Sequence, residues 1–148
     1  MLSSLQSREQ GGGGDGGMEK RGFVRHHREL EVYQLSFDAA MLIFQESKSF
    51  PSEERYSLTD QIRRSSRSVC ANLAEAWRRR RYTAAFVFKL NEVEAEASET
   101  QTWLEFVVKC DYLKTETGRE LYKTYDVVVG KLVFMINNPH PWILPNKK

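Results

Sequence analysis

Four stretches of helical hydrophobic periodicity follow one another between Leu30 and Asn137, and they constrain the fold more than any other feature of the sequence. Apolar side chains recur there at spacings of three and four, which places them on one face of an α-helix. No segment shows the sustained period-two alternation of a half-buried β-strand. The sequence therefore predicts an all-α protein.

Short breaks separate the four predicted helices. We expect them at roughly 30–48, from between Ser52 and Ser57 to about 82, at 83–110, and from 115 or 116 to 137. Pro51 disfavours helical geometry in the residue before it, and Ser57 with Asp60 resembles a capping box for the second helix. Connections this short favour antiparallel neighbours, so we expect an up-down-up-down four-helix bundle.

The predicted helices differ in how many apolar faces they carry. The third has one long seam, made by Phe86, Leu90, Val93, Ala97, Thr100, Leu104 and Val108. The first has two stripes, one with Leu30, Tyr33, Phe37, Met41 and Phe44 and the other with Val32, Leu35, Ala39, Leu42 and Ile43. A helix that is apolar on two sides needs partners on both, more than one bundle supplies.

Length and composition predict one folded domain with a tail at each end. The chain has 148 residues, 41% of them hydrophobic, enough for a single core. Residues 1–28 contain the run GGGGDGG and are expected to be disordered, residues 29–138 form the bundle, and residues 139–148 form a C-terminal tail. Trp142 and its neighbours are expected to dock on the bundle or on another copy. Met18 is a second candidate start.

The stretch from Gln61 to Tyr82 separates, as a helix, into a small-apolar face and an arginine face. Residues 54–82 hold eight arginines and three acidic residues, a local charge of +5 in a chain whose net charge is +2. A solvated helix face also carries charge, but the one-sided excess favours an anionic partner. The candidate phosphate-binding residues are Arg63, Arg64, Arg67, Arg78, Arg79, Arg80 and Arg81.

Several classes of protein are excluded by what the sequence lacks. No run of about 18 apolar residues is long enough for a membrane span, and the N-terminus lacks the apolar centre of a signal peptide, which predicts a cytoplasmic protein. The three histidines lie outside the predicted helices, so an inward-facing di-metal site is not expected. We found no P-loop and no nucleophile beside a histidine base. We therefore expect no catalytic residues, metal or cofactor.

Two further groups of polar residues stand beside the predicted core. Asn72 and Glu75 flank core-facing Leu73 and Ala76, and they are either exposed or part of a hydrogen-bonded network between helices or subunits. The third helix has an acidic flank with one large aromatic, made by Glu92, Glu96, Glu99 and Trp103.

The motif residues from Pro51 to Glu75 resemble a known family. The pattern is a proline and glutamate before L-x-x-Q-x-R-R, followed by S-x-x-x-N-x-A-E, and here it falls on Pro51, Glu54, Leu58, Gln61, Arg63, Arg64, Ser68, Asn72, Ala74 and Glu75. The chain resembles the bacterial four-helix-bundle family of 23S rRNA intervening-sequence proteins, similar in fold to accessory proteins of diversity-generating retroelements. The resemblance implies a ring-shaped homopentamer. The family usually has glycine after N-x-A-E, where this chain has Ala76 and Trp77.

Two hypotheses about function follow. The first is a non-enzymatic, oligomeric protein that binds nucleic acid, most simply structured RNA, through the arginine face. The alternative is a protein-interaction or scaffold module in which the arginines of one subunit pair with the acidic flank of the next. The sequence leaves open which nucleic acid is bound.

Overall fold

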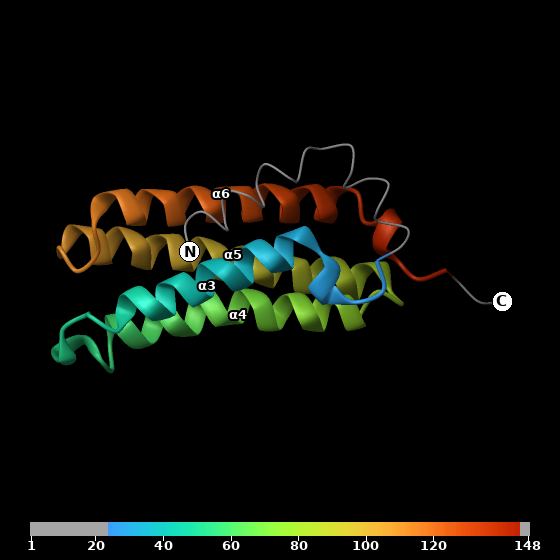
Figure 1. The fold of residues 1–148 in the computed structure, drawn as a ribbon. Helices are drawn as coiled ribbons and strands as arrows, with labels where there is room; N and C mark the ends of the chain where they lie inside the picture. Colours follow the sequence, from blue (N-terminus) through green and yellow to red (C-terminus); the bar gives the residue numbers. More distant parts are fainter. Residues whose placement is uncertain (1–23, 146–148) are drawn as a thin grey trace.

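The computed structural model describes residues 24–145, which form four long helices joined by short connections. In chain order the elements are η2 (His27–Glu29), α3 (Glu31–Ser47), η3 (Ser52–Glu54), α4 (Leu58–Arg78), α5 (Thr83–Lys109), α6 (Thr115–Asn137) and η4 (His140–Trp142). The helices run alternately in opposite directions, and the described residues contain no β-strand (Figure 1). The predicted all-α four-helix bundle is confirmed, and the helix ends lie within a few residues of the expected positions.

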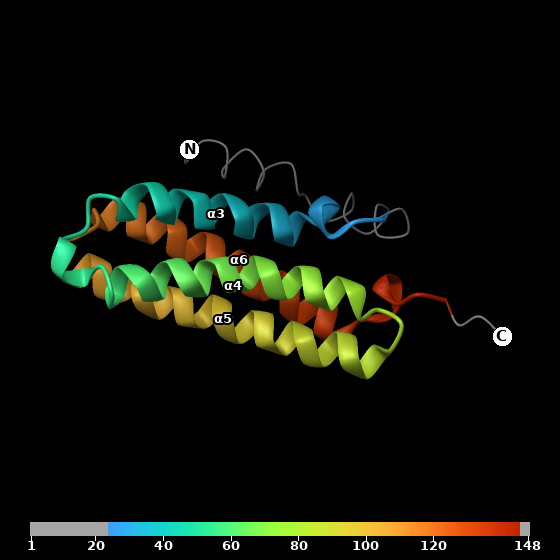
Figure 2. The same cartoon turned by 90° about the horizontal axis from the view of Figure 1, so that it is seen from below.

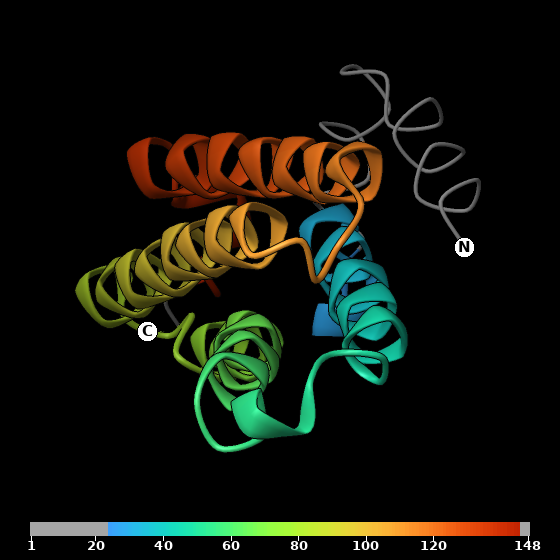
Figure 3. The same cartoon turned by 90° about the vertical axis from the view of Figure 1, so that its left-hand side faces the viewer.

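Each helix packs beside the helix that follows it in sequence, and α6 closes the bundle against α3. Viewed from one end, the four helices surround a common core (Figure 3). The α3–α4 and α5–α6 connections lie at that end, whereas the α4–α5 connection and both ends of the described chain lie at the other (Figures 1 and 2). Residues from α4, from the N-terminal lead-in and from the C-terminal segment therefore meet at one end of the bundle.

The predicted apolar stripes form the core, with one exception in α3. Along α5 the seam is buried from Phe86 to Leu104, and Val107 replaces Val108 as its last fully buried residue. The α3 stripe that begins at Val32 is buried as well. On the other α3 stripe, Phe37 is 47% exposed and Met41 is 41% exposed. One bundle therefore covers only one of the two apolar faces of α3.

The C-terminal segment docks on its own bundle. Trp142 is buried, and its ring meets Phe134 of α6 edge-on with 6.2 Å between the centroids. Residues 1–23 of the tail predicted to be disordered lie outside the described residues. Residues 24–28 are described and do not behave as a free tail, because the backbone oxygen of Arg25 accepts a hydrogen bond from the Trp77 ring nitrogen at 3.4 Å. Arg25, which the sequence places in the tail, therefore contacts the end of α4.

The start of α4 is held by Glu54, and the predicted capping box between Ser57 and Asp60 is wrong. Ser57 makes no side-chain bond to the helix, because its hydroxyl donates to Oε1 of Glu54 at 2.6 Å. The same oxygen accepts the Leu58 amide at 3.4 Å, and the hydroxyl of Tyr112 donates to Oε2 at 3.0 Å. Glu54 thereby caps α4 and ties it to the α5–α6 connection.

These bonds make the Glu54–Tyr112 pair sensitive to pH in both directions. Donation by Ser57 and Tyr112 lowers the pKa of Glu54, and the bond to Glu54 raises the pKa of Tyr112 to about 12. A carboxylate with a lowered pKa contributes stability above its unfolded value and loses it as pH falls through the folded one. A phenol with a raised pKa contributes stability below its unfolded value and loses it as pH rises towards 12.

We predict that Tyr112→Phe lowers the melting temperature near neutral pH, because it removes the hydroxyl and keeps the ring. The difference from the unsubstituted protein should shrink below about pH 4 and again above about pH 10. Thermal unfolding followed by circular dichroism across this range tests it. Tyr56→Phe is the control, since Tyr56 is 87% exposed and its hydroxyl has no hydrogen-bond partner among residues 24–145. A constant difference at every pH would contradict the prediction.

Two glycines of α6 give a matched test of packing. A Cβ at buried Gly118 would overlap Cγ2 of Val108 in α5, whereas a Cβ at exposed Gly130 would meet nothing within 4 Å. We predict that Gly130→Ala stabilises the fold by about 0.5–1 kcal/mol through helix propensity. Gly118→Ala should destabilise it by about 1–3 kcal/mol through overpacking, partly relieved by adding Val108→Ala. Urea unfolding measures both; equal effects of the two alanines would refute the packing argument.

Candidate nucleic-acid interface

A basic groove of about 500 Å³ runs along the outer side of the first half of α4. Four arginines and one acidic residue contribute to its lining, which consists of Arg55, Thr59, Asp60, Arg63, Arg64, Arg67, Ser68 and Ala71. The core residues Ile62, Val69 and Leu73 hold the opposite face of α4 inside the bundle. Helical periodicity therefore fixes the arginines on the outside.

Two of the groove arginines are oriented by α3. The Nε of Arg63 donates to the hydroxyl of Ser47 at 2.7 Å. The guanidinium carbons of Arg63 and Arg67 lie 5.0 and 5.7 Å from the centroid of the Phe44 ring, and the Lys48 ammonium lies 4.9 Å from it. Three cations thus gather around one aromatic ring, with cation–π attraction offsetting part of their mutual repulsion. Such a cluster favours an anion nearby.

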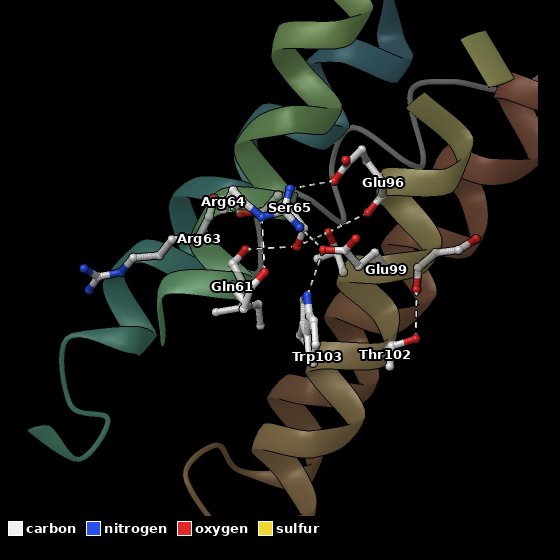
Figure 4. Close-up of polar contacts among 12 residues, drawn as sticks. Gln61, Arg63, Arg64, Ser65, Glu96, Glu99, Thr102 and Trp103 are labelled. Atoms are coloured by element: carbon white, nitrogen blue, oxygen red, sulfur yellow. Dashed lines mark hydrogen bonds and ion pairs between the residues drawn. The ribbon is translucent and has the colours of Figure 1, made fainter. Parts of the chain in front are cut away.

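Arg64 is turned the other way, towards α5 (Figure 4). It forms ion pairs with Glu96, at 3.4 Å, and with Glu99. Its Nε donates to the side-chain oxygen of Gln61 at 3.2 Å, and the ring nitrogen of Trp103 donates to Glu99 at 3.1 Å. Figure 4 shows Arg63 pointing away from this group. Arg64 is therefore already neutralised, and it is the weakest of the predicted phosphate contacts.

The same geometry changes the scaffold hypothesis. Glu96 and Glu99 were expected to pair with arginines of an adjacent subunit, but Arg64 of the same chain reaches both. The pairing is available within one chain because α4 and α5 are antiparallel neighbours. Since exposed pairs contribute about 0–1 kcal/mol each, this network orients the helices more than it stabilises them.

Glu75 also finds its partner within the chain, and that partner is a lysine. The ammonium of Lys89 in α5 lies 2.6 Å from Glu75 and 2.8 Å from Glu92. Bonding to Lys89 and its charge lower the pKa of Glu75. Asn72 is half-buried, and its side chain has no hydrogen-bond partner among residues 24–145. The two residues thus differ, because Glu75 joins a network between helices and Asn72 does not.

Arg80, at the far end of α4, has a structural role. Its guanidinium carbon lies 3.5 Å from the centroid of a Trp77 ring, and its Nε donates to the Trp77 carbonyl at 2.7 Å. Another nitrogen of Arg80 donates to the carbonyl of Trp142 at 3.4 Å, and the Leu144 amide donates to the carbonyl of Arg80 at 3.0 Å. Burial lowers the pKa of Arg80. These contacts occupy the Arg80 side chain within the chain, and its role as a phosphate contact stays a prediction.

The predicted arginine face is consequently divided into two groups. One comprises half-buried Arg63 and exposed Arg67 in the groove. The other comprises Arg78, Arg79 and Arg81, which are exposed at the α4–α5 connection. Eleven residues of helix separate Arg67 from Arg78, a rise of about 16 Å. A ligand that contacts both groups must extend along α4.

The sequence pattern does not predict three cations of this region as site residues. Arg55 was counted in the local charge and not assigned, although it lines the groove. Lys48 became relevant only when α3 placed it over Phe44, and Lys89 only when α5 placed it beside Glu75. Spacing along one helix reveals a face, but it does not identify residues that reach that face from a neighbouring helix.

Other kinds of site are not apparent in the part of the chain that the structure describes. Among residues 24–145 no group of three or more His, Cys, Asp or Glu side chains is placed to hold a metal ion. None of the described helices has the length and apolarity to cross a membrane.

Comparison with known proteins adds the evolutionary relationship. The family model of the 23S rRNA-intervening sequence protein matches residues 28–133. The chain belongs to this family. Among solved structures, it is similar to a protein of unknown function from the S23 ribosomal protein family of Bacteroides thetaiotaomicron, with 29% identity and a TM-score of 0.65 over 72% of this chain and 99% of that one. No curated protein matches.

In this family member, several motif positions act in structure. Glu54 caps α4, Leu58 is buried, and Gln61 supports Arg64. After the N-x-A-E element α4 continues through Ala76 and Trp77, where the family usually has glycine. These contacts explain why the motif identifies a fold, and they leave the groove arginines as the residues with exposed charge.

We predict that Arg80→Ala lowers the stability of the fold by about 1–2 kcal/mol, because it removes the stacking on Trp77 and two hydrogen bonds. Arg79→Ala is the matched control, since Arg79 is exposed and carries the same charge. Thermal unfolding at constant salt compares them. If both variants melted alike, the structural assignment of Arg80 would fail.

Proposed function

We propose that this family member is a non-enzymatic, oligomeric cytoplasmic protein that binds structured RNA through the groove of α4. The observation that supports the proposal best is the groove itself, in which Arg55, Arg63 and Arg67 surround one acidic residue, Asp60. A guanidinium offers two parallel N–H donors that match a phosphate, and it stays charged at any physiological pH. Phosphate contacts supply most of the affinity of such an interface.

Neighbouring acids are arranged so that they do not oppose an incoming phosphate. Arg64 pairs with Glu96 and Glu99, and Lys89 pairs with Glu75 and Glu92, so each cation offsets part of the charge of two carboxylates. Three of these carboxylates belong to α5, and none of the four lines the groove. The potential along the outer face of α4 is therefore dominated by the arginines that remain exposed.

Oligomerisation is supported by the uncovered stripe of α3, where Tyr33 stacks near Phe37 and Met41 is exposed. Exposed apolar side chains gathered on one helix face mark an interaction surface. A symmetric assembly would repeat the groove, so that several weak phosphate contacts act together. The same stripe also supports the alternative of a protein-interaction module. That alternative depends mainly on the stripe, because Arg64 of the same chain already pairs with Glu96 and Glu99.

We predict that the double variant Arg63→Ser/Arg67→Ser loses RNA affinity and salt dependence together. Removing two phosphate contacts should reduce the slope of log affinity against log salt by about 1.4–1.8. Fluorescence anisotropy with a labelled RNA hairpin at several salt concentrations measures both quantities. Arg119→Ser/Lys123→Ser on α6 is the control, since it removes the same charge from two other exposed positions.

Equal binding by the two double variants would mean that only net charge matters, and the groove would be refuted. Light scattering of the purified protein, before and after nuclease treatment, reports its assembly and any RNA that remains bound. A monomer that carries no RNA and binds none in the titration would overturn the proposed function.

A further inference from the structure

Two tyrosines stand at the two ends of α4 with their rings in solvent. Tyr56 is 87% exposed and lies two residues before the helix, and Tyr82 is 67% exposed and lies four residues after it. Each follows an arginine in sequence: Tyr56 follows Arg55, which lines the groove, and Tyr82 follows the exposed Arg81. Basic residues interleaved with exposed aromatic rings are typical of surfaces that bind unpaired nucleic acid.

These two rings differ from the other tyrosines of the chain. Tyr125 is fully buried, Tyr122 is half-buried, Tyr112 donates to Glu54, and Tyr33 packs near Phe37. The rings of Tyr56 and Tyr82 make no ring contact or side-chain hydrogen bond with any residue in 24–145. Their exposure therefore has no explanation in the packing of this fold.

The outer face of α4 connects the two rings. At about 100° per residue, Arg67 and Arg78 point within roughly 20° of each other, and Ala71 lies between them near the same direction. Ala71 lines the groove and adds no bulk to it. The one acid on this stretch, Glu75, is drawn aside by Lys89 of α5. The outer face of α4 thus carries Arg67, Ala71 and Arg78 along one side. One tyrosine precedes the helix and another follows it.

Resting on the proposed function, we propose that the RNA bound by this face is an unpaired stretch that lies along α4. Its bases stack on Tyr56 and Tyr82, and its phosphates contact Arg63, Arg67 and Arg78. In a duplex each base is already stacked and paired, so it has no free face to offer a tyrosine ring. Unpaired bases present that face, and every base does so, which makes the recognition tolerant of sequence.

The length of α4 sets the size of the ligand. Its 21 residues rise about 31 Å. Bases stacked about 3.4 Å apart would need roughly nine nucleotides to extend from one tyrosine to the other. In the groove, the Asp60 carboxylate and the Ser68 hydroxyl are acceptors for a ribose 2′-hydroxyl, which DNA lacks. A single-stranded loop within a folded RNA satisfies these conditions.

The test uses the full chain and four labelled ligands. Three are single strands without stable secondary structure: a 12-nucleotide RNA, a 4-nucleotide RNA, and the DNA strand with the sequence of the longer RNA. The fourth is the 12-nucleotide RNA paired to its complement. We expect the 12-nucleotide RNA strand to bind at least tenfold more tightly than each of the others. Equal binding of the duplex, or equal binding of the DNA strand, would overturn the inference.

Paired variants isolate the rings. Tyr56→Ala/Tyr82→Ala should weaken binding of the 12-nucleotide RNA by about tenfold or more and leave the salt slope unchanged, because no charge is removed. Tyr56→Phe/Tyr82→Phe keeps both rings and should bind within about twofold of the unsubstituted protein. Both double variants should melt alike, since both residues are exposed. Equal affinities of the alanine and phenylalanine variants would refute stacking.

The two proposals fail separately in this design. If Arg63→Ser/Arg67→Ser weakens RNA binding and the tyrosine variants do not, the proposed function stands and the inference fails. If the arginine variant binds like its control, or if no RNA binds at all, the proposed function fails and the inference fails with it.

Discussion

The contact between α4 and α5 determines the rest of the surface. It is the most extensive helix pair in the described structure, and at its centre the buried hydroxyls of Ser65 and Thr100 lie 2.9 Å apart. On the solvent side of that contact, Arg64 meets Glu96 and Glu99, and further along Lys89 meets Glu75. These contacts fix the register of two antiparallel helices and the rotation of α4 about its axis. Once that rotation is fixed, Arg67 and Arg78 of α4 are exposed on its outer side.

A consequence of this register is that the glutamates at the α4–α5 contact form their ion pairs with cations of the same chain. Four carboxylates lie near the arginine face in sequence or in space; Glu75, Glu96 and Glu99 pair with a cation of the neighbouring helix, and Glu92 pairs with Lys89 of its own helix. The charge left over is positive and lies on the side of α4 away from α5. Phe44, on α3, then draws Arg63 and Arg67 over its ring and keeps them near each other. The basic groove is therefore a product of three helices, although its charges come mostly from one.

The sequence predicts most of the fold because each helix has its own hydrophobic periodicity and its own end signals within a short stretch of sequence. Pro51 and Asn138–Pro139 end two of them, and the seam from Phe86 to Leu104 shows its period over most of α5. Contacts between helices are not predictable in this way. Lys89 lies 14 positions from Glu75, and Arg80 acquires its role only when the C-terminal segment folds back to it. Face assignments from one helix therefore place Arg63 outside the core, but they cannot show that Arg80 packs on Trp77 and reaches Trp142.

The substitution of Ala76 and Trp77 for the usual glycine of the family has a physical consequence at the far end of α4. Glycine at this point favours the end of a helix, whereas Ala76 and Trp77 are both buried and let α4 continue to Arg78. Trp77 then serves as a platform: Arg80 stacks on it, its ring nitrogen reaches the backbone of Arg25, and Arg80 reaches Trp142. Trp77 and Arg80 thereby hold both ends of the described part of the chain, at Arg25 and at Trp142, against the end of α4. The extra helical length also places Arg78 on the same side of α4 as Arg67, about 16 Å further along the helix.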